Sequence, residues 1–137
     1  MRHRKSSKRM GRNTAHRLAL KRNLVRSLFL SYNESGYIMT TVEKAKFVKP
    51  FAEKLITLAK NNTLHNYRRG LQLLDDEDAV KTLFDDIGPA YKERPGGYTR
   101  IVRRADKRLG DKATLALFAF VREGAVEAAT VAEDSEE

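Results

Sequence analysis

The chain has 137 residues, the size of one ordinary domain, and its 41% of hydrophobic residues is sufficient for a single core. Its 27 lysines and arginines outnumber its 18 aspartates and glutamates, and the net charge of +9 predicts a polyanionic partner: RNA, DNA or an anionic membrane face. The absence of cysteine excludes disulfides, cysteine-based zinc sites and thiol nucleophiles.

The positive charge is concentrated toward the N-terminal end. Residues 1–33 contain ten lysines and arginines and no acid, residues 34–122 contain 17 basic and 12 acidic residues, and residues 123–137 contain six acids and no base. The opening MRHRKSSKRMGRN lacks the apolar stretch of a signal peptide, and no apolar run approaches the ~20 residues of a membrane span. We expect a cytoplasmic protein, and a basic transit peptide is the weaker alternative.

The first elements are a basic extension and a helix. Apart from Met1, residues 1–12 contain one large apolar side chain, Met10, and they are expected to form a flexible extension. Asn13 or Thr14 can cap a helix that runs to about Tyr32. The expected core face of this helix holds Leu18, Val25, Leu28, Phe29 and Tyr32, and its exposed face holds Arg17, Lys21, Arg22 and Arg26.

A strand and a longer helix follow. Residues 37–42 have β-prone composition, and Thr40 with Glu43 has the spacing of a capping box that starts a helix to about Lys60. Pro50 predicts a kink in this helix or a break into two pieces. Its expected core face is Ala45, Val48, Ala52, Leu55, Ile56 and Ala59.

Two shorter helices come next. The segment 61–63 ends the previous helix and caps one over residues 64–74. Asp75 or Asp76 caps another that continues through Phe84 and is stopped by Gly88-Pro89.

The chain closes with a predicted hairpin. Residues 94–98 form a loop whose two glycines permit positive φ, and strands over residues 98–105 and 113–122 pair through the connection 106–112. The order α-β-α-α-α-β-β predicts an α+β fold, a small mixed three-stranded sheet packed against helices. We expect one domain over residues 13–122, preceded by the basic extension and followed by an acidic, disordered tail over residues 123–137.

The sequence provides no constellation for catalysis or metal binding. His3, His16 and His65 have no acid or second ligand at suitable spacing. The acids 75–78 could bind Mg²⁺, but at a helix start they serve the cap and the dipole. Neither GxxxxGK[ST] nor GxGxxG occurs. We predict no enzyme, no metal, no cofactor and no small-molecule substrate.

Two regions favour RNA contact. The stronger is the N-terminal extension with the first helix, although a solvated tail or a localisation sequence is the alternative for the extension. The second is the Gly-Gly loop, where arginines pair with phosphates and Tyr98 can stack on a base, although a plain turn is the alternative. The predicted RNA-binding residues are Arg2, His3, Arg4, Lys5, Lys8, Arg9, Arg12, His16, Arg17, Lys21, Arg22, Arg26, Arg94, Gly96, Gly97, Tyr98, Arg100, Arg103 and Arg104.

Ordered motifs over about residues 1–122 resemble a known family. They are the opening MRHR, His16-Arg17, Thr40-Thr41, Leu55–Lys60, Leu83-Phe84, Ile87-Gly88-Pro89 and the run Gly96-Gly97-Tyr98-Thr99-Arg100-Ile101. Together they resemble the bacterial large-subunit ribosomal protein seventeen family. The resemblance implies a structural protein that binds large-subunit ribosomal RNA near the polypeptide exit region and touches neighbouring ribosomal proteins. The alternatives are a free DNA- or RNA-binding regulator, which needs a helix-turn-helix, and an enzyme acting on nucleic acid, which needs clustered carboxylates.

Overall fold

The protein, seen as a computed structural model, is described at residues 1, 3 and 8–122. Its elements are α1 (Thr14–Leu30), β1 (Tyr37–Thr41), α2 (Val42–Ala59), α3 (Leu64–Leu74), α4 (Glu77–Thr82), the π-helical turn η1 (Leu83–Ile87), α5 (Gly88–Ala90), β2 (Thr99–Lys107) and β3 (Thr114–Phe120). Because α4, η1 and α5 follow one another directly, they form one helical stretch. The predicted α+β class and the order α-β-α-α-α-β-β are confirmed. Residues 2 and 4–7 of the expected extension, and the whole of the expected acidic tail over residues 123–137, lie outside the described residues.

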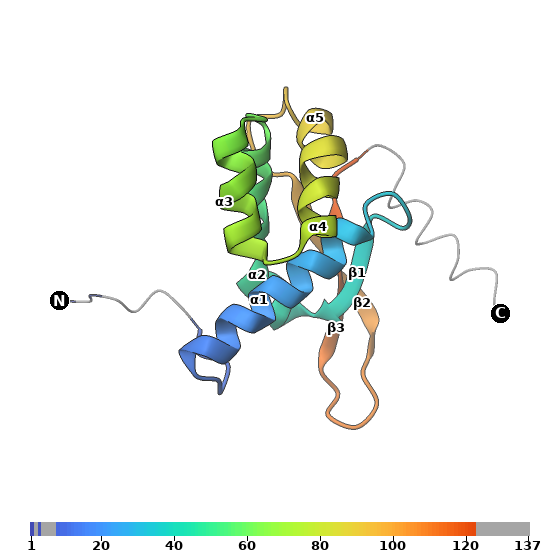
Figure 1. Ribbon diagram of the computed structural model, residues 1–137. Helices are drawn as coiled ribbons and strands as arrows, with labels where there is room; N and C mark the ends of the chain where they lie inside the picture. The colour runs from blue at the N-terminus through green and yellow to red at the C-terminus, as the bar shows by residue number, and fades with distance from the viewer. Residues whose placement is uncertain (2, 4–7, 123–137) are drawn as a thin grey trace.

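The three strands form one sheet in the order β1-β3-β2. Both pairs are antiparallel: Tyr37 lies opposite Ala119 in one, and Thr99 lies opposite Phe120 in the other. The expectation of a mixed sheet is therefore wrong. β1 and β2 run in the same direction, but β3 lies between them and separates them. Figure 1 shows the helices gathered beside this sheet and the β2–β3 hairpin projecting beyond them.

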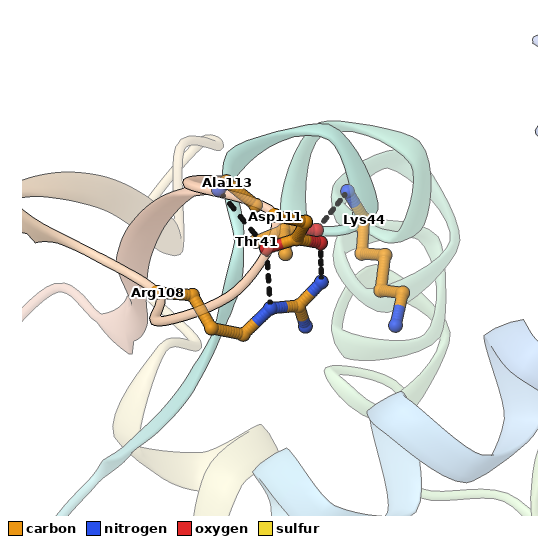
Figure 2. A network of polar contacts seen from close by, with 5 residues as sticks. All are labelled: Thr41, Lys44, Arg108, Asp111 and Ala113. Carbon is orange, nitrogen blue, oxygen red and sulfur yellow. Dashed lines mark hydrogen bonds and ion pairs between the residues drawn. The ribbon is translucent and has the colours of Figure 1, made fainter.

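The tip of the hairpin is closed by its own side chains. The Asp111 carboxylate accepts hydrogen bonds from the Arg108 guanidinium and, at 3.1 Å, from the Ala113 backbone N–H. Figure 2 shows this turn together with Thr41, at the start of α2. Hydrogen bonds from Arg108 and from the backbone hold the pKa of Asp111 down to about 2. The turn therefore keeps its carboxylate ionised at any ordinary pH.

Side-chain caps start the helices close to the predicted positions. Asn13, Thr63 and Asp76 accept backbone N–H bonds at the starts of α1, α3 and α4. The cap of α2 is Thr41, whose hydroxyl accepts from Lys44 N at 3.4 Å, and not Thr40 as predicted. Thr40 is paired with Ala116 inside β1, so the strand runs directly into the helix without a connecting loop.

Two prolines affect the helices less than expected. α2 continues through Pro50, so the predicted break is wrong, and a kink without a break stays a prediction. Pro50 and Lys46 are both exposed, so water can bond the carbonyl that a proline leaves free. Gly88-Pro89 does not stop the helical stretch that begins with α4 either, because α5 adds a turn through Ala90. Proline is tolerated there because it falls in the first turn of α5.

Aromatic side chains from distant elements meet on β3. The ring of Phe120 lies 6.2 Å from that of Phe29, 5.0 Å from that of Tyr32 and 6.2 Å from that of Tyr91. All six core positions predicted for α2 are buried. Leu18, predicted to face the core, is 44% exposed because it lies two turns before the first buried residue of α1, Val25.

Replacing Gly88 with alanine should destabilise the protein. A Cβ atom at Gly88 would lie 2.6 Å from the backbone oxygen of Ala59, so the close approach of α5 to α2 requires a glycine. We expect Gly88→Ala to lower the free energy of unfolding, measured by urea denaturation, by about 1–3 kcal/mol. Gly96→Ala is the matched control, because a Cβ atom there would have no other atom within 4 Å and the φ of Gly96 is not positive, so stability should stay unchanged. Equal stability of the two variants would contradict the packing argument.

Candidate nucleic-acid interface

The described part of the N-terminal extension is a turn that contacts the domain. Arg12 N donates to Arg9 O at 3.0 Å, and Met10 and Gly11 adopt positive φ. Lys8 forms an ion pair with Glu43 in the first turn of α2, and this contact lowers the pKa of Glu43. His3 is exposed, whereas Arg2, Arg4 and Lys5 lie outside the described residues.

Hydrogen bonds from two arginines hold this turn against the start of α1. The guanidinium of Arg12 donates to Met10 O at 2.8 Å, and that of Arg17 donates to Arg12 O at 2.6 Å. The side chains of Arg9 and His16 are exposed and make no such contact in the described part of the chain. The two bonded arginines therefore position the extension, while Arg9 and His16 remain accessible to a ligand.

The cations of α1 do not form the open, solvent-facing stripe that the periodicity predicts. Arg17, Lys21, Arg22 and Arg26 are all half-buried. The ammonium of Lys21 lies 4.8 Å from the ring centroid of Phe47, a cation–π contact. The expectation that these four side chains form the exposed face of α1 is therefore wrong, because neighbouring elements already provide contacts for them.

Arg22 and Arg26 bind the C-terminal end of α3. Arg22 Nε donates to Leu73 O and Arg26 Nε donates to Leu74 O, each at 2.9 Å. The last carbonyls of a helix have no partner within the helix, and they carry the negative end of its dipole. The two arginines satisfy these carbonyls, and they fix the position of α1 against α3.

The Gly-Gly loop is held by bonds to its own backbone. Arg94 Nε lies 3.2 Å from Gly96 O and 3.3 Å from Gly97 O, and Lys60 Nζ donates to Arg94 O at 2.6 Å. Of the two glycines, which both permit positive φ, only Gly97 adopts it, at 61°. Both glycines have open space where a Cβ would stand, which leaves their backbone accessible to a ligand.

Tyr98 belongs to the core and not to the exposed loop. It is 2% exposed, and its ring lies 5.6 Å from that of Tyr91. Its hydroxyl lies 3.2 Å both from Thr57 Oγ1 and from Lys60 Nζ. Burial alone would raise the pKa of Tyr98, but these two hydrogen bonds lower it below the ordinary value. The predicted stacking of Tyr98 on a base is therefore wrong for this structure, and its role is to position the loop.

The arginines of β2 lie along the edge strand of the sheet, which is the first strand of the hairpin. Arg103 is exposed, and Arg104 is half-buried and bonds Asp106 at 2.9 Å. Arg100 is half-buried, and its Nε is buried without a hydrogen-bond partner among the described residues. A buried donor without a partner is costly, and a bound anion would satisfy it.

A further set of basic residues, which the sequence analysis did not identify, lies on α3. They line a groove of ≈ 580 Å³ between α1 and α3. Its lining includes Leu18, Arg22, His65, Arg68, Arg69 and Gln72. The signal was present in the sequence, because His65, Arg68, Arg69 and Gln72 follow the i, i+3, i+4, i+7 spacing of one helix face.

The acidic residues are engaged in local structure. Asp76 caps α4, and Glu77 and Asp78 lie in its first turn, where the helix dipole favours acids. Within residues 1, 3 and 8–122, no three histidine or acidic side chains gather in a way that could hold a metal ion. None of the helices formed by the same residues combines the length and the apolar character of a membrane span.

Comparisons with known proteins agree on one family. The sequence model of the family described as "Ribosomal protein L17" matches residues 20–121. The "Large ribosomal subunit protein bL17" of Carboxydothermus hydrogenoformans is 52% identical over 108 residues, which cover 79% of this chain and 92% of that protein. The protein of the same name from Thermus thermophilus is 47% identical over 121 residues, which cover 88% of this chain and 99% of that protein.

Replacing Arg26 should weaken the junction between α1 and α3. In Arg26→Gln the shorter amide cannot reach Leu74 O, which leaves a helix-end carbonyl without its charged donor. We expect the free energy of unfolding to fall by about 1.5 kcal/mol, measured by urea denaturation. The control is Lys54→Gln on α2, because Lys54 is exposed and makes no hydrogen bond or ion pair within the described chain. If Arg26→Gln were as stable as this control, the hydrogen bonds from Arg26 to α3 would contribute nothing to the free energy of unfolding.

Proposed function

The chain belongs to the ribosomal protein L17 family, and on this premise we propose that it binds and stabilises large-subunit ribosomal RNA as a structural constituent of the bacterial large ribosomal subunit. The family is a structural component of the ribosome and not an enzyme. This agrees with the expectation of a non-catalytic protein.

The observation that carries RNA binding is the charge of residues 1–33, which hold ten lysines and arginines and no acid. A cationic segment of this kind gains affinity by releasing the counterions condensed on phosphates, with little dependence on base sequence. Arg2, Arg4, Lys5, Lys8, Arg9 and Arg12 neutralise phosphates from the extension, and His3, His16, Arg17 and Lys21 continue the contact onto α1. Arg22 and Arg26 contribute charge from positions fixed by α3.

A second contact surface lies at the loop before β2 and along that strand. The accessible backbone of Gly96 and Gly97 permits a close approach of RNA, and Arg94 and Arg100 pair with its phosphates. Arg103 and Arg104 extend this surface toward the projecting hairpin. Two separate cationic surfaces on one rigid domain hold RNA segments together that would otherwise repel each other.

The position that we propose for the protein in the subunit rests on the resemblance of its sequence motifs to the family. We propose a position near the polypeptide exit region, with neighbouring ribosomal proteins as further partners. The projecting β2–β3 hairpin is suited to reach such neighbours (Figure 1).

Sedimentation tests the proposal as a whole. After a cell extract is centrifuged through a sucrose gradient at moderate salt, we expect the protein in the large-subunit fractions, detected by an antibody. An Arg100→Ala variant should be depleted from these fractions and enriched at the top of the gradient, because the second surface loses its half-buried cation. Unaltered protein found only at the top of the gradient would refute a ribosomal role.

The salt dependence of RNA binding tests how much the N-terminal extension contributes to it. A variant lacking residues 2–7 loses Arg2, Arg4 and Lys5, and each phosphate contact contributes roughly −0.7 to −0.9 to the slope of log K against log salt. We expect the slope on a large-subunit ribosomal RNA transcript to become shallower by roughly 2, measured by filter binding. A slope that stays the same would show that these three cations do not touch phosphate.

A further inference from the structure

The groove between α1 and α3 is a surface of which the RNA contacts proposed above use only Arg22. It measures ≈ 580 Å³, and its lining includes Arg22 and Leu18 from α1 and His65, Arg68 and Arg69 from α3. Among the described residues, no acidic side chain lines it, so its charge is of one sign.

The basic side chains on the α3 side of the groove are accessible. His65, Arg68 and Arg69 are exposed, and within the described chain none of their side chains makes a hydrogen bond or an ion pair. An ordinary solvated helix face mixes both signs, whereas α3 contains two arginines, one histidine and no acid over residues 64–74. Folding of the domain does not account for this choice of residues.

The C-terminal end of α3 would repel anions from one end of the groove, but two arginines neutralise it. α3 ends beside the groove at Leu73 and Leu74, and its terminal carbonyls would present the negative end of the helix dipole. Arg22 and Arg26 donate to these carbonyls at 2.9 Å. Positive charge therefore continues along the groove past the helix end.

The chemistry of the lining favours a phosphate backbone over a protein surface. Guanidinium groups present planar arrays of donors that match phosphate oxygens. The core of a protein–protein interface is apolar and depleted of charge, whereas Leu18 is the one exposed large apolar side chain among the described residues that line the groove.

We propose that the groove between α1 and α3 binds the sugar–phosphate backbone of RNA, with Arg68 and Arg69 paired to phosphates. Arg22, already oriented by Leu73 O, adds a third cation. This inference rests on the proposed function, because it takes RNA as the partner, and it adds a contact surface on α3 that the N-terminal extension and the β2 arginines do not include.

A double variant tests the groove. In Arg68→Gln/Arg69→Gln the helix keeps two good helix formers, and no side-chain bond within the described chain is lost, so thermal unfolding should be unchanged. The loss of two phosphate contacts should make the slope of log K against log salt shallower by roughly 1.4 to 1.8 on a large-subunit ribosomal RNA transcript. Lys54→Gln/Lys81→Gln removes the same charge from exposed positions on α2 and α4, and it should leave the slope unchanged.

Each outcome decides the inference. A change confined to the groove variant supports it, whereas equal slopes for the groove variant, its control and the unaltered protein overturn it. An unchanged slope combined with loss of the groove variant from large subunits also overturns it, in favour of a protein partner. If the unaltered protein binds the transcript without dependence on salt, it is the proposed function that fails.

Discussion

The central position of β3 is the constraint on which the rest of the structure depends. β3 is the last strand of the described residues, yet it lies between the other two, so this sheet is completed only when the chain has reached Phe120. Phe120 N donates to Gly36 O before β1, and Val121 N donates to Tyr98 O before β2. The same end of β3 brings the Phe120 ring against Phe29, Tyr32 and Tyr91. Hydrogen bonding and aromatic packing therefore join the two ends of the domain at one place.

This arrangement positions the loop before β2. Tyr98 is anchored in the core below the loop, and Lys60 reaches from the end of α2 to both the Tyr98 hydroxyl and Arg94 O. Glu53, also on α2, accepts from Thr99 N and Oγ1 at the first residue of β2. A loop held at both ends in this way presents its glycine backbone at a defined position, which lowers the entropy that would be lost when a ligand binds there. The buried tyrosine thus supports the loop from the core.

The cations of α1 combine a structural and an electrostatic role. Arg22 and Arg26 satisfy the carbonyls at the end of α3, and they keep their positive charge while they do so. Such a pair offsets the negative helix end at the surface between α1 and α3. Because both roles belong to the same guanidinium groups, the packing of α1 on α3 and the sign of the groove between them depend on each other.

The sequence by itself determined the helices, the hairpin, the charge and the family. Helix starts depend on bonds over three residues, as at Asn13, Thr63 and Asp76, and a periodicity of 3.6 identifies the core face of α2, so both can be found without tertiary information. Only the tertiary structure decided the antiparallel strand order, the burial of Tyr98 and the engagement of Arg22 and Arg26. These depend on contacts between residues 51 positions apart for Arg22 and Leu73, and 41 apart for Thr57 and Tyr98. A local pattern identifies an arginine on a helix face, but the element that lies beside that face decides whether the charge meets solvent, a carbonyl or a phosphate.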